Sequence, residues 1–208
     1  QFIYSTGKQY GLERDWYMDE RRDPVKATHA ACKYLKDLYK KFDNWNLALA
    51  AYNCGEGRVL RASKLHQTYD FWQLHSLPRE TRNYIPYFLS AAIIAKFPEK
   101  YGFKAETAEP FTYEIVNLEK SADIAVLARV AGLKASVLRD FNPELRQSAT
   151  PTIENYPLKL PVGKKGPFLS AWNAIPQDER FAPQFIVHRV RYGESLWTIS
   201  KRRCRSQW

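Results

Sequence analysis

The chain has 208 residues, of which 45% are hydrophobic and 14% aromatic, so a disordered or fibrous protein is excluded. Lysine and arginine outnumber aspartate and glutamate by 32 to 22, which gives a formal net charge of +10. The basic residues are spread through every segment without an aromatic-basic motif for nucleic acid. Another anionic polymer explains the surplus as well as a nucleic acid does, and a solvated basic surface is the simplest explanation.

The first hundred residues have the pattern of a helical domain. Asp23 and Pro24 predict a helix start, with the aspartate as N-cap and the proline at the first helical position. Apolar residues then recur at the spacing of one buried helical face: Ala31, Tyr34, Leu35, Leu38 and Phe42. A second helix is expected to begin near residues 43–44 and a third near Thr81 or Pro86, ending at 97–98. Residues 88–95 fall short of the about 20 apolar residues of a membrane span, so we expect a core helix there.

The end of the second helix is the most informative stretch. It runs from an apolar segment into Tyr52 and Asn53 and then into Gly55 and Gly57, whose backbone freedom suits a helix end. A phenol and a carboxamide in this position can stack on a sugar and hydrogen-bond it. A buried tyrosine followed by a C-cap explains the same residues equally well.

The pattern changes from residue 111 onward. A strand is expected over 113–116, helices over 124–130 and 137–141, and a returning strand over 156–161. Residues 167–185 read as a helix flanked by linker. A further strand, turn and amphipathic helix are expected over 187–202.

The three cysteines decide little. Cys32 and Cys54 lie in predicted helices and are expected to be buried, unpaired thiols, while Cys204 lies near the end of the sequence. Their odd number and spacing fit no metal site, and we expect neither a metal nor a cofactor.

Four motifs stand in order along the first 86 residues: Gln1-Phe2; Asp19-Glu20-Arg21-Arg22-Asp23-Pro24; Ala51-Tyr52-Asn53; and Glu80-Thr81 followed by Tyr84 and Pro86. This order and spacing resemble the family 1 lytic transglycosylases, which cut peptidoglycan, and within them the membrane-bound lytic murein transglycosylase D type. The resemblance is close over residues 1 to about 100 and looser beyond.

The resemblance implies an α+β fold class with four parts. Residues 1–104 would be the C-terminal part of a lysozyme-like SLT domain, and 105–166 a degenerate LysM-like βααβ domain. Residues 167–185 would be the linker with its helix, and 186–208 the truncated start of a second LysM module. The chain is therefore expected to be a fragment of a longer protein.

The resemblance also implies an activity, the non-hydrolytic cleavage of the bond between N-acetylmuramic acid and N-acetylglucosamine that leaves 1,6-anhydro ends. Such enzymes use one glutamate as acid and base, and it lies upstream of the glutamine matched by Gln1. No catalytic residue is therefore expected in this chain, and Tyr52, Asn53, Tyr84 and Gln1 would bind the sugar. Glu56, in a glycine-rich helix end, and Glu80, at a helix start, are the alternative acids, although structural roles fit them better.

The two LysM-like segments differ in their loops. Gly193, Glu194, Ser195 and Leu196 match the sugar-contacting loop of LysM modules. In the 105–166 segment that loop is replaced by residues 117–121, so we expect this domain to fold without binding sugar and to act as packing or spacer.

Three classes of function remain open at this point. They are a peptidoglycan lytic transglycosylase present as a fragment, a non-catalytic murein-binding protein, and, least favoured, a nucleic-acid-binding protein. The expected partner is the peptidoglycan glycan strand, with no nucleic acid. The protein is expected to be a monomer in the periplasm or cell envelope, attached to the outer membrane only through an N-terminal anchor outside this chain.

Overall fold

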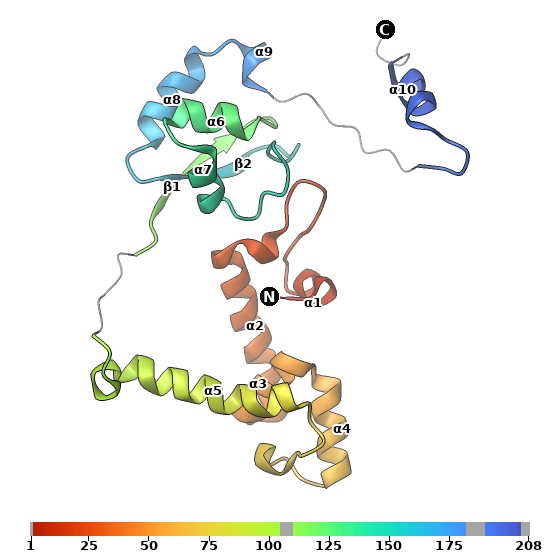
Figure 1. Cartoon of the computed structure of the whole chain (residues 1–208), viewed down its shortest axis with the longest axis vertical. Helices are drawn as coiled ribbons and strands as arrows, with labels where there is room; N and C mark the ends of the chain where they lie inside the picture. Colours follow the sequence, from red (N-terminus) through yellow and green to blue (C-terminus); the bar gives the residue numbers. More distant parts are fainter. Residues whose placement is uncertain (1, 105–109, 182–189, 205–208) are drawn as a thin grey trace.

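The computed structural model describes residues 2–104, 110–181 and 190–204, without the side chains of 177, 178 and 202–204. We refer to residues 2–104 as the helical domain and to 110–181 as the βααβ domain (Figure 1). The helical domain contains α1 (Tyr4–Gln9), α2 (Pro24–Phe42), α3 (Trp45–Cys54), α4 (Glu56–His66) and α5 (Arg79–Lys96). Short 3-10 helices cover Glu20–Arg22, Phe71–Gln73 and Pro98–Tyr101.

The helix starts follow from their caps. The Asp23 carboxylate accepts hydrogen bonds from the Val25 and Lys26 amides at 2.9 and 3.0 Å, which confirms the predicted start of α2. Asn44 caps α3 in the same way, through its side-chain oxygen. Helix α3 is the centre of the core, because it packs against α2, α4 and α5. Its residues 47–51 are all buried.

The expectation of three helices is wrong, because the described part of the helical domain also contains α1 and a helix that begins directly after Gly55. Helix α3 ends at Cys54, and α4 begins at Glu56. Gly55 makes the joint between them, with φ 89° and ψ 140°, a conformation open to glycine but strained for other residues. Gly57 lies inside α4, so Glu56 stands in the first turn of a helix and not at a helix end.

Helix α5 is only partly a core helix. It begins at Arg79 and passes through Pro86, and its buried residues are Thr81 and Ile85. The expected core helix over 88–95 is wrong, because Phe88, Leu89 and Ile93 are 44%, 38% and 47% exposed. Within the described ranges, no helix is both long enough and apolar enough to cross a membrane.

The βααβ domain has the predicted order of elements: β1 (Tyr113–Leu118), α6 (Ile124–Ala131), α7 (Ala135–Phe141) and β2 (Tyr156–Pro161). The strands pair antiparallel, with Tyr113 opposite Pro161 and Leu118 opposite Tyr156. Helix α8 (Lys165–Ala174), which falls in the expected linker, packs into the same core through Phe168 and Trp172. The α+β fold class is confirmed, whereas the domain boundaries at 104, 166 and 185 stay predictions.

Helix α9 (Gln177–Arg180) stands at the end of this domain, and α10 (Leu196–Cys204) follows it along the chain. The strand expected near 187–192 falls partly outside the described residues, and residues 190–192 are not a strand. Cys54 is half-buried, but the expected burial of Cys32 is wrong because it is exposed on α2. Both are free thiols.

Candidate functional site

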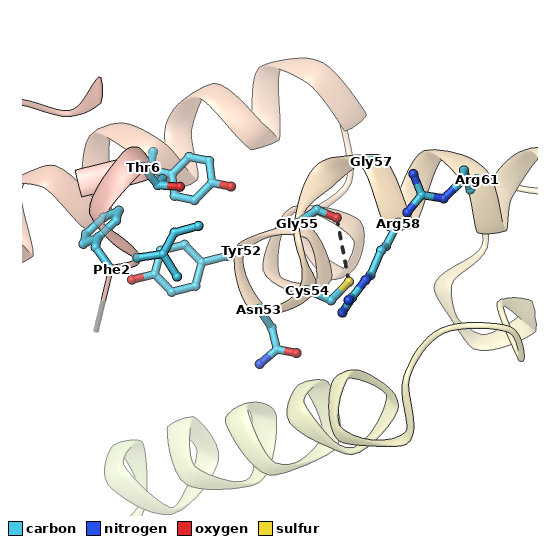
Figure 2. Close-up of a pocket in the computed structure, with 11 residues that line it drawn as sticks. Phe2, Thr6, Tyr52, Asn53, Cys54, Gly55, Gly57, Arg58 and Arg61 are labelled. Atoms are coloured by element: carbon cyan, nitrogen blue, oxygen red, sulfur yellow. Dashed lines mark hydrogen bonds between the residues drawn. The ribbon is translucent and has the colours of Figure 1, made fainter. Parts of the chain in front are cut away.

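A pocket of about 500 Å³ opens beside the end of α3 (Figure 2). This volume lies within the range of ordinary small-ligand sites. The pocket is lined from α1, α2, α3 and α4 by Phe2, Ile3, Thr6, Tyr34, Tyr52, Asn53, Cys54, Gly55, Gly57, Arg58 and Arg61. Helices α3 and α4 meet here because α3 ends at Cys54 and the chain turns at Gly55 into α4.

Aromatic rings form one side of the pocket. The Tyr52 ring centroid lies 6.1 Å from that of Phe2 and 5.5 Å from that of Tyr34. Phe2 is buried, and Tyr52 and Tyr34 are half-buried, so the rings are fixed by packing. Such a surface offers both a stacking face and phenol hydroxyls, the combination that suits a sugar ring.

The two tyrosines keep their protons at neutral pH. Burial raises the pKa of Tyr52, with a smaller contribution from Tyr84. Burial also raises the pKa of Tyr34, and the nearby Glu56 adds to it. The pKa of the Cys54 thiol is raised by burial as well, so the pocket presents neutral donors and not a thiolate nucleophile.

Asn53 is held by a partner that the sequence analysis did not single out. The Thr81 hydroxyl in the first turn of α5 donates a 2.7 Å hydrogen bond to the Asn53 amide oxygen. Thr81 is 1% exposed, so its hydroxyl is shielded from water. The bond orients the Asn53 amide and leaves its NH2 group free to donate to a ligand. Thr81 belongs to the fourth sequence motif, and this was the feature of the sequence that could have indicated its role beside Asn53.

Arg58 and Arg61 give one edge of the pocket positive charge. Both come from α4 and both were missed, because no helix was expected after the glycines. Among the described residues, neither guanidinium has a carboxylate partner within ion-pair distance. An arginine without a partner at a pocket edge can bind an anionic group of a ligand.

The other predicted sugar-binding residues do not all join the pocket. Gln1 lies outside the described residues. Tyr84 packs, half-buried, against the same core cluster as Tyr52, but it is not among the residues that line the pocket. Its sugar-binding role stays a prediction, as do those of Tyr52, Asn53 and Gln1.

The alternative acids lie outside the pocket. Glu56 forms an ion pair with Lys41 at 3.1 Å, and Glu80 is exposed in the first turn of α5. Neither lines the cavity, and in the described part of the chain none of the lining residues is a carboxylate. Across the same described ranges, no cluster of His, Cys, Asp and Glu could hold a metal ion.

Gly193, Glu194 and Ser195 precede α10, and Leu196 is its first residue. Gly193 has φ 84°, and the Glu194 carboxylate accepts a hydrogen bond from the Arg191 amide at 2.8 Å. The Ser195 hydroxyl accepts one from the Thr198 amide at 3.2 Å, as an N-cap does. Leu196 is 87% exposed. Their role in sugar binding stays a prediction.

Comparison with known families agrees with this architecture. Residues 1–75 match the transglycosylase SLT domain, and residues 112–177 match the LysM-like domain of lytic transglycosylase MltD. The resemblance to lytic transglycosylases is confirmed: the chain carries an SLT domain followed by a LysM-like domain of the D type.

Two individual proteins similar to this chain are also named as transglycosylases. The chain is 40% identical over 154 residues to the membrane-bound lytic murein transglycosylase D of Escherichia coli K12, a match that covers 71% of this chain and 34% of the relative. It is 38% identical over 94 residues to the peptidoglycan transglycosylase gp16 of Escherichia phage T7, covering 44% of this chain and 7% of that protein. The chain thus spans about a third of the length of the first relative.

Proposed function

We propose that the pocket binds the glycan strand of peptidoglycan, and that the chain is part of a lytic transglycosylase. The observation that carries the proposal is the Tyr52–Asn53 pair, which lines a pocket of about 500 Å³ together with the rings of Phe2 and Tyr34. The similarity to proteins named lytic murein transglycosylase and peptidoglycan transglycosylase supports the same substrate.

The chemistry of the proposed reaction needs one acid and a well-oriented sugar. Protonation of the glycosidic oxygen breaks the bond through an oxocarbenium-like transition state. The resulting carboxylate then takes the proton of the 6-hydroxyl of the muramic acid, which attacks its own anomeric carbon and closes the 1,6-anhydro ring. In this scheme the Tyr52 hydroxyl and the Asn53 NH2 group hold the sugar in the reactive orientation.

The acid itself is assigned outside the pocket described above. In lytic transglycosylases it is a glutamate upstream of the position matched by Gln1, and we propose the same here. Glu56 forms an exposed ion pair with Lys41 and does not line the pocket, and Glu80 is placed to stabilise the start of α5. Positioning groups alone do not replace a proton donor.

A second function is murein binding without turnover. It is favoured by the absence of a carboxylate among the described residues that line the pocket. Both functions use the same pocket and the same residues, and they differ only in whether the bond is cut.

The proposed setting is the cell envelope, since the substrate is peptidoglycan and the D-type relative is named membrane-bound. We further propose a periplasmic location, an anchor to the outer membrane outside this chain, and a monomeric state.

The proposal is tested with purified peptidoglycan sacculi. We expect the chain to bind sacculi, and Asn53→Ala to weaken that binding at least several-fold, whereas Asn46→Ala on the same helix leaves it unchanged. Mass spectrometry of the supernatant should find no anhydro-muropeptides. If the chain does release anhydro-muropeptides and Glu56→Gln or Glu80→Gln abolishes that release, our assignment of the acid is overturned. Equal binding of sacculi by the Asn53 and Asn46 variants would contradict our proposal that the pocket binds the glycan strand.

A further inference from the structure

The loop of residues 13–23, here called the docking loop, joins the helical domain to the βααβ domain. Figure 1 shows the chain after α1 reaching the domain that carries β1 and β2. Two backbone hydrogen bonds form the joint, from the Asp19 amide to the Glu144 carbonyl at 2.8 Å and from the Arg146 amide to the Tyr17 carbonyl at 2.7 Å. Together they make an antiparallel bridge between Met18 and Leu145. Paired backbones restrict the two domains far more than a tether does.

A buried ion cluster lies beside this joint. Lys159 on β2 places its Nζ atom 2.5 Å from the Asp23 carboxylate and 3.2 Å from that of Glu144. The three residues are 7%, 1% and 5% exposed. The Tyr156 hydroxyl donates to the Glu144 carboxylate at 2.9 Å. Asp23 is the member that the helical domain supplies, so the complete cluster exists only when the domains are docked.

The pKa values of Lys159 and Asp23 are both altered by their pairing. Burial alone would lower the pKa of Lys159, but the hydrogen bonds to Asp23 and Glu144 and the charges of both carboxylates together outweigh burial and raise it. Burial alone would raise the pKa of Asp23, but the bond to Lys159 and its charge, together with the amides of Val25 and Lys26, outweigh burial and lower it. Lysine and aspartate are therefore both charged at neutral pH, and each depends on the other for compensation.

One chain of contacts leads from this joint to the pocket. Asp19, whose amide is held by Glu144, binds the Arg21 guanidinium through both carboxylate oxygens, at 2.8 and 2.6 Å. Arg21 also donates to the Phe2 carbonyl at 2.9 Å. Phe2 forms the pocket wall. A Cβ atom at Gly7 of α1 would lie 3.1 Å from the Arg21 side chain, so α1 packs closely against the arginine.

A second chain of contacts runs through α2. One carboxylate oxygen of Asp23 caps the first turn of α2, while the other binds Lys159. Helix α2 carries Tyr34, which lines the pocket and contacts the rings of both Phe2 and Tyr52. The βααβ domain therefore contacts the supports of two pocket walls.

We propose that the LysM-like βααβ domain is a brace that positions the pocket walls of the helical domain, with Lys159 and Arg21 as positioning residues. In this account the βααβ domain holds α1 and α2 in fixed positions relative to each other through the docking loop, and it does not bind sugar itself. The sugar-binding consequence rests on the proposed function, but the brace does not, and the two are measured separately.

The test uses the full chain and three variants. Lys159→Met leaves Asp23 and Glu144 without their cation. Arg146→Ala removes the exposed side chain that donates to the Asp15 carbonyl and leaves the buried cluster intact. Lys165→Met is the matched control, an exposed lysine of the same domain. We measure amide hydrogen exchange by NMR and affinity for chitotetraose.

In the Lys159 variant we expect the amides of α1 and of residues 12 and 19 to exchange about tenfold faster or more than in the wild type. The increase should be smaller in Arg146→Ala, and Lys165→Met should exchange like the wild type. Chitotetraose affinity should fall in the same order while circular dichroism stays unchanged. Faster exchange confined to the βααβ domain would overturn the brace, and if Lys159→Met does not fold, Arg146→Ala decides by the same criterion. Failure of the wild-type chain to bind chitotetraose would contradict the proposed function. The hydrogen-exchange rates alone would then decide whether the βααβ domain positions α1 and the docking loop.

Discussion

The Thr81 hydroxyl and the Asn53 amide oxygen lie 2.7 Å apart and join the start of α5 to the end of α3. Because Thr81 is 1% exposed, this bond fixes which way the Asn53 amide faces. In this orientation the NH2 group of Asn53 is available to donate to a ligand in the pocket.

Thr81→Val tests this relationship, since valine keeps the shape and removes the hydroxyl. We expect a loss of about 1 kcal/mol in unfolding free energy and a several-fold weaker affinity for chitotetraose, because Asn53 loses its orientation. The matched control is Thr28→Val on the exposed face of α2. Urea denaturation and titration calorimetry measure the two effects. Unchanged affinity in the Thr81 variant would separate this bond from ligand binding.

Gly55 and Gly57 should respond in opposite ways to alanine. Gly55 has φ 89°, so Gly55→Ala should cost about 1–3 kcal/mol of stability despite the open space around it. Gly57 is helical, and a Cβ atom there would lie 3.6 Å from an Arg61 nitrogen, an ordinary contact. Gly57→Ala should therefore be neutral or stabilising by about 0.5–1 kcal/mol. Thermal melting of both variants gives the comparison, and equal losses would contradict the assigned joint.

The sequence predicted the parts of the fold that depend on neighbouring residues. The cap at Asp23, the apolar face of α2 and the order of strands and helices in the βααβ domain were all readable from local patterns. The start of α4 was not, because a glycine that ends one helix can also open the next. The apolar run 88–95 predicted burial, but periodicity does not show whether another element covers a helix face.

The candidate site was predictable only where its residues stand in a local pattern. Tyr52 and Asn53 stand at a visible helix end, whereas Arg58 and Arg61 became candidates only once α4 was known. Contacts between distant segments left no local signal. Arg146 meets Asp15 across 131 positions, and Lys159 meets Asp23 across 136.

The ion pair of Lys159 and Asp23 predicts a definite pH dependence. The pKa of Asp23 is lowered on folding, so its contribution is complete above the unfolded value of about 4 and is lost as the pH falls through the folded value. The pKa of Lys159 is raised, so its contribution is complete below about pH 10 and is lost as the pH rises through the folded value. The stabilisation should therefore be greatest between about pH 4 and pH 10.

Urea denaturation of the wild type and of Lys159→Met checks this dependence. Near pH 7 the variant should be less stable by about 3–5 kcal/mol, because two buried carboxylates lose their cation. The difference should shrink toward pH 3 and toward pH 11. Lys165→Met supplies the reference for an exposed lysine, and a difference that stays constant with pH would contradict the charged pair.

Arg58 and Arg61 should distinguish acidic from neutral glycans. Replacing both by alanine should weaken binding of muramic-acid oligomers with a free carboxylate by roughly 3–10-fold, because charged hydrogen bonds are lost. Binding of neutral chitotetraose should change much less. The double variant Lys33→Ala/Lys36→Ala, which removes equal charge from exposed positions on α2 outside this pocket, serves as control. Equal losses for both glycans would show that the arginines act through structure.

The most direct test of the account is to map, by NMR of the labelled chain, where an N-acetylglucosamine–N-acetylmuramic acid oligomer binds. The account predicts saturable shift changes centred on Phe2, Tyr34, Tyr52 and Asn53, with none at the residue 117–121 loop that replaces the LysM sugar loop. Absence of saturable changes around Tyr52 and Asn53, or changes confined to the βααβ domain, would contradict it.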